Sequence, residues 1–227
     1  MLDTLRREDM NLLKTIGGVK VYFDTGAILY KTGATVNGDG SPHCYHPDDD
    51  QGLDYLANAG SSGEWWGIYA PPGGTGKPVV QSIYHPAPGY YISTTALVNP
   101  DYPQDHPDRY IDSERYPFMV APGSFGEGWT LGDIGFCYNE KTTDNMYCAT
   151  GDIGPTNHIG EVSMLLAKCL GLDADPKKGG TDAGIVYVVF PGSDPGYKPW
   201  AKKCQIAVDK FGAWGGMTKL KQLMPQL

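Results

Sequence analysis

The chain has 227 residues, a formal net charge of −8, 31 glycines and 18 prolines. This length suits one domain with a sizeable core, and turn residues spread along the whole chain are typical of many short segments. The absence of a basic patch argues against nucleic-acid binding, and no run of about 18 apolar residues is present to span a membrane.

The first segment, residues 1–16, carries a loose stripe of leucines among charged residues, which predicts a short helix. We expect residues 1–18 to form an N-terminal helical extension and residues 19–227 to form the main domain. The start of the chain is charged and has no long apolar stretch, so it does not resemble a signal peptide.

Strand-like runs follow at short intervals between glycine and proline turns. VKVYF (19–23) predicts a strand, and TGAILYKT is its expected partner. The further predicted strands are residues 65–70, 78–85, 90–98, 116–121, 133–139, 146–151 and 185–192. Regular short strands suggest a barrel or a sandwich. We expect a mainly β fold with a few helices and a single-domain, compact, β-barrel-like core.

Two helices are expected in the second half of the chain. In IGEVSMLLAKCLGL the apolar residues recur at the spacing of one helical face, and Gly171 is well placed to end the helix. A final helix is expected over residues 198–213.

The stretch TGDIGPTNHIGEVS, from Thr150 to Ser163, contains two carboxylates among glycines. We expect Asp152 just past a strand end and Glu161 in the first turn of the following helix. Two carboxylates that face a cleft can hydrolyse a glycoside. Purely structural roles stay open, because acids also favour turns and first helical turns. His158 either tunes this pair, binds substrate, or is a surface loop residue.

Metal and cofactor chemistry finds little support in the sequence. HCYHPDDD (43–50) combines two histidines with three acids, but such groups are common in turns. No P-loop, GxGxxG or GxSxG motif is present. The five cysteines include no CxxC pair, and a bridge between Cys137 and Cys148 across neighbouring strands is left open. We therefore expect no metal and no cofactor.

Several runs, in the same order along residues 37–216, resemble the chitosanases of glycoside hydrolase family 75. They are GDGSPHCYHPDDDQGLDYLANAG, WWGI, GKPVVQ, PGYYISTTALV, RYIDSERYPFMVAPG, LGD (131–133), GDIGPTNHIGEVSMLLAKCLGL and IVYVVFPGS. The family motif D-x-G-P…I-G-E-x-S falls on Asp152 and Glu161. Val162 stands where the family usually has glycine, which puts the fine specificity in doubt rather than the reaction.

The resemblance implies endo-hydrolysis of chitosan, a β-1,4 polymer of glucosamine, with inversion at the anomeric carbon, by a chitosanase-like catalytic domain. It also implies a compact β-barrel and secretion, although this chain shows no signal peptide. By analogy with inverting enzymes, Glu161 is expected to be the general acid and Asp152 the general base. The dipole of the expected helix opposes this assignment, because it would stabilise the charged form of Glu161.

A polycationic substrate fits the acidic chain, although acidity alone also serves solubility. The acids considered for the subsites are Asp39, Asp54, Asp112, Glu127 and Asp133. Of these, Asp39 and Asp112 are the expected substrate-binding acids, together with Tyr91, Trp66 and His158. We expect a monomer that binds neither nucleic acid nor membrane. The alternatives are a hydrolase of another polysaccharide, such as β-glucan or peptidoglycan, and a non-catalytic carbohydrate-binding domain.

Overall fold

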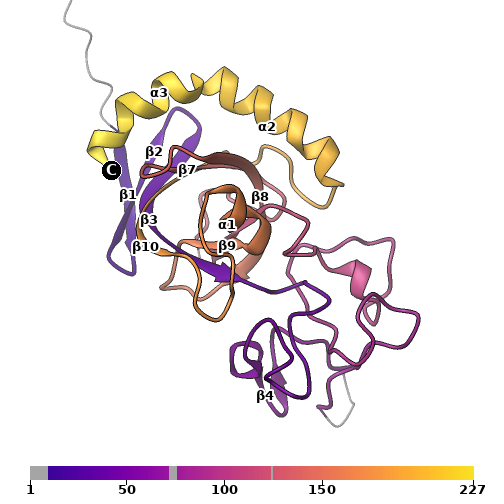
Figure 1. The fold of residues 1–227 in the computed structure, drawn as a ribbon. Coiled ribbons are helices and arrows are strands. Elements are labelled where there is room, and N and C mark those ends of the chain that lie inside the picture. The colour runs from indigo at the N-terminus through magenta and orange to yellow at the C-terminus, as the bar shows by residue number, and fades with distance from the viewer. Residues whose placement is uncertain (1–9, 72–75, 124) are drawn as a thin grey trace, which may run out of the picture.

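The computed structural model describes residues 10–71, 76–123 and 125–227, and it is built around a closed six-stranded β-barrel (Figure 1). The ring closes because β9 pairs both with β6 and, in parallel, with the end of β3. The predicted mainly β fold with a single-domain barrel core is confirmed. In order around the ring, the strands are β3 (Ala27–Asn37), β10 (Thr181–Val189), β7 (Ile134–Asn139), β8 (Asn145–Gly154), β6 (Phe118–Pro122) and β9 (Glu161–Ser163).

The barrel wall is buried on both faces where β3 and β10 run side by side. Tyr30 and Tyr187 point into the barrel, where their rings stack with centroids 4.5 Å apart. The alternate residues, including Leu29 and Val188, point outward and pack beneath the C-terminal helices. Because successive side chains of a strand point to opposite faces, burial of both faces explains the nearly continuous apolar run IVYVV.

The helices cover the outside of the barrel or pack against its core. Helices α2 (Trp200–Trp214) and α3 (Gly216–Leu223) lie along the outer face of the barrel (Figure 1), which confirms the predicted final helix. Helix α1 (Met164–Cys169) contributes Leu166 and Ala167 to the interior cluster. Short 3-10 turns are η1 (Leu56–Ala59), η2 (Pro107–Arg109) and η3 (Met224–Gln226).

A buried lysine joins α2 to the barrel. The Lys203 side chain is fully buried, and its ammonium donates to the carbonyl oxygens of Gly132 and Asp194 at 2.7 and 2.8 Å. It also donates to the Asp194 carboxylate at 2.8 Å. All three donor positions of the ammonium are therefore used, as a buried charge requires.

The predicted N-terminal helix is wrong for residues 11–16, which form strand β1 (Asn11–Ile16); residues 1–9 lie outside the described part of the chain. β1 pairs with β2 (Val19–Asp24) through the two-residue turn Gly17–Gly18, whose φ angles are 53° and 87°. Two positive φ angles in succession are typical of the tight turns that join hairpin strands, and two glycines adopt them readily. The segment is therefore an edge hairpin of the sheet and not a helical extension.

Residues 38–117, as far as they are described, form an irregular lobe beside the barrel, which we call the loop lobe (Figure 1). Its regular elements are η1, η2 and two short strands, β4 (Gly60–Ser61) and β5 (Glu64–Trp65). The strands predicted over 65–70, 78–85 and 90–98 are mostly wrong, because these runs meet only in single bridges such as Val80 with Tyr91.

The other predicted strands are confirmed as β2, β3, β6, β7, β8 and β10. Cys137 of β7 and Cys148 of β8 are both free thiols, with their sulfur atoms 3.8 Å apart. They are not direct partners, because Cys137 lies opposite Met146 and Cys148 opposite Gly135. Within the described residues, no helix is long and apolar enough to cross a bilayer.

Candidate active site

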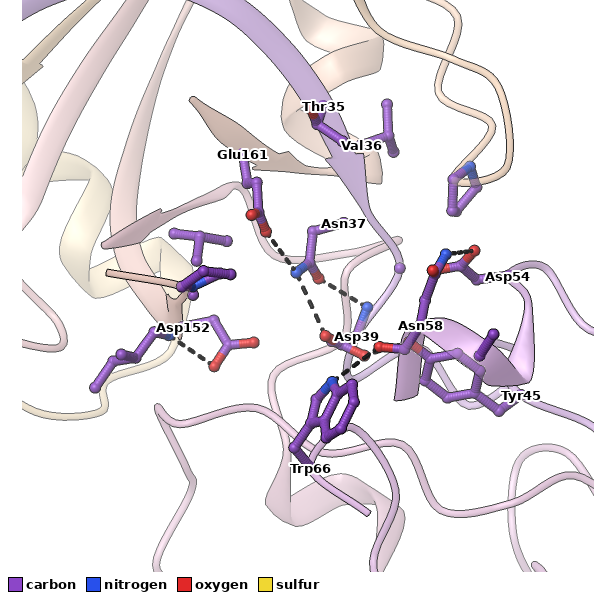
Figure 2. Close-up of a pocket in the computed structure, with 17 residues that line it drawn as sticks. Thr35, Val36, Asn37, Asp39, Tyr45, Asp54, Asn58, Trp66, Asp152 and Glu161 are labelled. Carbon is purple, nitrogen blue, oxygen red and sulfur yellow. Dashed lines mark hydrogen bonds between the residues drawn. The ribbon is translucent and has the colours of Figure 1, made fainter. Parts of the chain in front are cut away.

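A cavity of about 610 Å³ lies between the loop lobe and the outer face of β3, β6, β8 and β9 (Figure 2). The barrel wall contributes Asn37, Asp152 and Glu161 to its lining, and the loop lobe contributes Asp39 and Trp66. The remaining lining residues are Thr35, Val36, Gly38, Tyr45, Asp54, Ala57, Asn58, Val120, Ile153, Gly154, Pro155 and Pro176.

The two predicted catalytic acids lie in one row across three strands. Val120 of β6 pairs with Asp152 of the parallel β8. On the other edge of β6, Met119 pairs with Val162 of the antiparallel β9, which brings Glu161 opposite Val120. Met119 and Val162 fill the barrel interior, so their neighbours in the row face outward to the cavity. Two strand spacings correspond to roughly 9–10 Å between the backbones of the two acids.

A bulge in β8 places Asp152 in this row of residues. The pairing with β6 passes from Thr150 directly to Asp152 and leaves out Gly151. A Cβ atom on Gly151 would lie 2.5 Å from the Phe118 side chain, so only glycine fits there without a shift of its neighbours. The extra residue changes the face on which the following side chain emerges. Asp152 therefore lies within β8, and not past its end as the sequence suggested.

Asp152 is held by the backbone of two segments. Its Oδ1 accepts N–H groups from Ala96 of the loop lobe and from Ile153, both at 2.8 Å. Burial raises the pKa of Asp152 to about 7, against these two donors, which lower it, and the charge of Glu161 adds to the rise. Asp152 is therefore expected to be partly protonated near neutral pH.

Glu161 lies in β9 and not in the first turn of a helix, which corrects the sequence-based expectation. The first turn of α1 is capped by the Ser163 hydroxyl, which accepts the N–H of Leu166 at 3.2 Å. The argument from the helix dipole therefore does not apply to Glu161. Its carboxylate instead meets Asn37 Nδ2 at 3.4 Å and His158 Nε2 at 3.5 Å, and its side chain is 18% exposed.

Asp39 adds a third acid to the cavity. Its Oδ1 accepts the Tyr45 hydroxyl at 2.7 Å. Burial, followed by the charge of Asp152, raises the pKa of Asp39 well above its ordinary value. Further along the cavity, the buried Asp54 accepts the Asn58 amide at 2.8 Å, and burial also raises the pKa of Asp54. No lysine or arginine is among the residues that line this cavity.

Trp66 presents an exposed aromatic face at the cavity. Its side chain is 68% exposed, yet the indole Nε1 donates to the carbonyl of Asn58 at 3.0 Å. This hydrogen bond fixes the ring while its face stays open to a ligand. A fixed, solvent-exposed indole is suited to stacking on a sugar ring or to contact with a cation.

The structure brings Asp152, Glu161, Asp39 and Trp66 together, with His158 touching Glu161 from the rim. Two predicted substrate-binding residues do not line the cavity. Tyr91 packs against the Cys44 and Tyr45 cluster, and Asp112 accepts the N–H of Glu114 and pairs with Arg115. Of the other acids considered, Asp133 is buried and binds backbone N–H groups of Thr130, Gly192 and Asp194, and Glu127 is not among the lining residues.

Four polar residues of the cavity were not singled out from the sequence: Thr35, Asn37, Tyr45 and Asn58. Each is a common residue type; the contacts of Tyr45 and Asn58 are local, whereas Asn37 meets Glu161 across 124 residues of chain. Within the described residues, no three His, Cys, Asp or Glu side chains gather in a way that would hold a metal ion. No family model matches the chain, and no curated protein is significantly similar to it.

Proposed function

We propose that this protein is an endo-acting, inverting glycoside hydrolase that cleaves β-1,4 linkages between glucosamine units of chitosan. The observation that carries the proposal is the row of Asp152 and Glu161 facing one cavity. Their backbone separation is compatible with the roughly 6.5–9.5 Å between carboxyl groups that leaves room for a water molecule in inverting enzymes. The sequence runs that resemble family 75 chitosanases support the same reaction and imply secretion.

The acid and base roles follow from the surroundings of the two carboxyl groups. Because the pKa of Asp152 is raised to about 7, it serves as the general acid and donates its proton to the glycosidic oxygen as the C1–O bond breaks. Glu161, which faces the Asn37 amide and His158, serves as the general base. It takes a proton from the water that attacks C1 from the opposite face. This assignment reverses the one expected from the sequence.

The substrate class follows from charge. Four carboxyl groups, from Asp39, Asp54, Asp152 and Glu161, gather in a cavity whose lining includes no basic residue. A neutral or acidic polymer gains nothing from such a lining, whereas the ammonium of a protonated glucosamine unit favours the ionised form of these acids and pairs with it. Release of reducing ends from chitosan, chitin and carboxymethyl cellulose tests this choice. Preference for either of the last two would identify another polysaccharide hydrolase, and binding without cleavage would identify a carbohydrate-binding domain.

The ionisation of Asp152 gives one prediction. Its carboxyl carbon is expected to titrate near pH 7 in a ¹³C NMR experiment on the free protein, because burial disfavours the charged form. The free protein is used because the amines of chitosan also titrate near neutral pH. Asp152→Asn identifies the resonance. A midpoint near the ordinary value of about 4 would remove the basis for Asp152 as the acid.

Trp66 gives a second prediction. Trp66→Ala is expected to raise KM for chitosan oligomers about 3- to 10-fold with little change in kcat, because stacking on an exposed indole contributes roughly 1 kcal/mol. Steady-state kinetics measures both constants. Tyr84→Ala is the matched control, since Tyr84 is 90% exposed and does not line the cavity. An equal loss in both variants would place substrate elsewhere.

A further inference from the structure

The side-chain amide of Asn37 bridges two carboxyl groups of the cavity (Figure 2). Its Nδ2 lies 3.4 Å from Glu161 Oε2 and 3.4 Å from Asp39 Oδ2. Its Oδ1 accepts the backbone N–H of Asp39 at 2.8 Å. Since a backbone N–H can only donate, the oxygen must face Asp39 N, which fixes the orientation of the amide. Both hydrogens of Nδ2 are therefore available to the two acids.

The backbone of Asn37 is anchored as firmly as its side chain. Asn37 is the last residue of β3, where it pairs with Ser163 of β9. Its carbonyl accepts the hydroxyl of the buried Ser113, and the same hydroxyl accepts the N–H of Met164 at the start of α1. Strand β3, strand β9 and helix α1 thus converge on one point, so Asn37 presents its amide from a rigid support.

Asn37 gives Glu161 a neutral hydrogen-bond donor from within the cavity, which the other neighbours of Glu161 do not. The ionisable groups near Glu161 are Asp152 from β8, Asp39 beyond the end of β3 and His158 from the rim, with Tyr187 of β10 on the other side, inside the barrel. Two of these are acids, which offer Glu161 no donor when they are ionised, and the His158 side chain is 47% exposed to solvent. The neutral amide of Asn37 donates to the Glu161 carboxylate. It forms no ion pair, which would make the carboxylate a weaker base.

We propose that Asn37 is a positioning residue, which holds Glu161 as an oriented carboxylate and spaces it from Asp39. The inference rests on the proposed hydrolase, in which Glu161 activates water. Loss of the amide leaves Glu161 beside two acids without an interior donor. Glu161 is then expected to fail as a general base at low pH. Its carboxylate is also expected to leave the position in which it faces the attacking water.

The test compares Asn37→Ala and Asn37→Asp with wild type. Asn37→Asp keeps the shape of the side chain but replaces the donor with a further acid. We expect kcat on chitosan to fall about 10- to 100-fold, with KM changed less than about threefold. The acidic limb of the pH–rate profile should move to higher pH, further in Asn37→Asp than in Asn37→Ala. Asn145→Ala, which removes an exposed amide at the far end of β8, should change neither.

A second measurement separates this inference from the proposed function. The ¹³C chemical shift of the Glu161 carboxyl carbon at neutral pH should differ from wild type in both variants, because the carboxylate loses the Asn37 donor, whether or not chitosan is cleaved. A reduced kcat with an unchanged chemical shift would show a merely structural role and overturn the inference. An inactive wild type with a changed chemical shift in the variants would overturn the hydrolase and keep Asn37 as the partner of Glu161. Asn37→Ser replaces either variant that fails to fold.

Discussion

Asp152→Asn and Glu161→Gln are each expected to lower chitosan hydrolysis by about 10²–10⁴-fold, the range that general acid–base catalysis contributes. Asn cannot donate the proton that leaves with the sugar oxygen, and Gln cannot accept the proton of the attacking water. Both replacements keep the size of the side chain and its place in the row across β6. Reducing-end release under saturating chitosan measures the loss.

Asp182→Asn is the charge-matched control, because Asp182 is exposed on β10 and does not line the cavity. Unfolding does not explain the loss in Asp152→Asn. The folded-state pKa of Asp152 lies above its unfolded value, so the fold loses stability as the pH rises from about 4 to about 7 and keeps that lower stability above pH 7. Removal of that charge is expected to leave the variant at least as stable as wild type above pH 7. Near-wild-type turnover in both variants would contradict the proposed site.

Lys203→Met is expected to lower the free energy of unfolding by about 3 kcal/mol, at the lower end of the loss from breaking a buried ion pair. The substitution leaves the buried Asp194 carboxylate without the ammonium and leaves two carbonyl oxygens, of Gly132 and Asp194, without a donor. Lys198, which also pairs with Asp194, limits the loss. Urea unfolding followed by tryptophan fluorescence measures the change.

Lys202→Met is the matched control, since it makes the same change on the exposed side of the same helix. Its effect on the free energy of unfolding should stay within about 0.5 kcal/mol. If Lys203→Met were equally mild, the apolar contacts of α2 with β7 and β10 would be sufficient to hold the helix.

The barrel strands other than β9 were predictable because their sequence pattern and their burial agree. The run over residues 185–189 is apolar at every position, and both faces of β10 are buried. The same agreement made the final helix predictable from its apolar face. Where the buried residues of a segment recur with the period of a strand or a helix, the local sequence pattern is therefore sufficient to predict the type of element.

The errors arose where one local pattern fitted two structures. Val162 begins an apolar stripe of helical period, yet it is a strand residue that fills the barrel interior. The three-residue strand β9 runs directly into α1. The helical period of the apolar residues therefore predicted a helix that began as early as Glu161. Likewise, Leu12 and Leu13 fitted a helix, whereas the Gly17–Gly18 turn makes their segment the edge strand of a hairpin.

The acids of the site were named from the sequence, but their surroundings were not. Asp152 and Glu161 are nine residues apart and share one motif, whereas Asn37 reaches Glu161 across 124 residues of chain. The register of β3, β6, β8 and β9 decides which neutral side chains meet the acids. The spacing of residues within a single segment does not reveal the register between strands.

Strand β3 has two neighbours along one edge: its first half pairs with β2, and Thr35–Asn37 pair with Glu161–Ser163 of β9. This short parallel seam closes the barrel and also joins Asn37 to Glu161. Local opening of the seam would separate these two residues while the remaining strands stay paired. The site therefore stays intact only while this three-residue strand stays paired. The local stability of β9, rather than the global stability of the barrel, limits how long the protein keeps an intact active site.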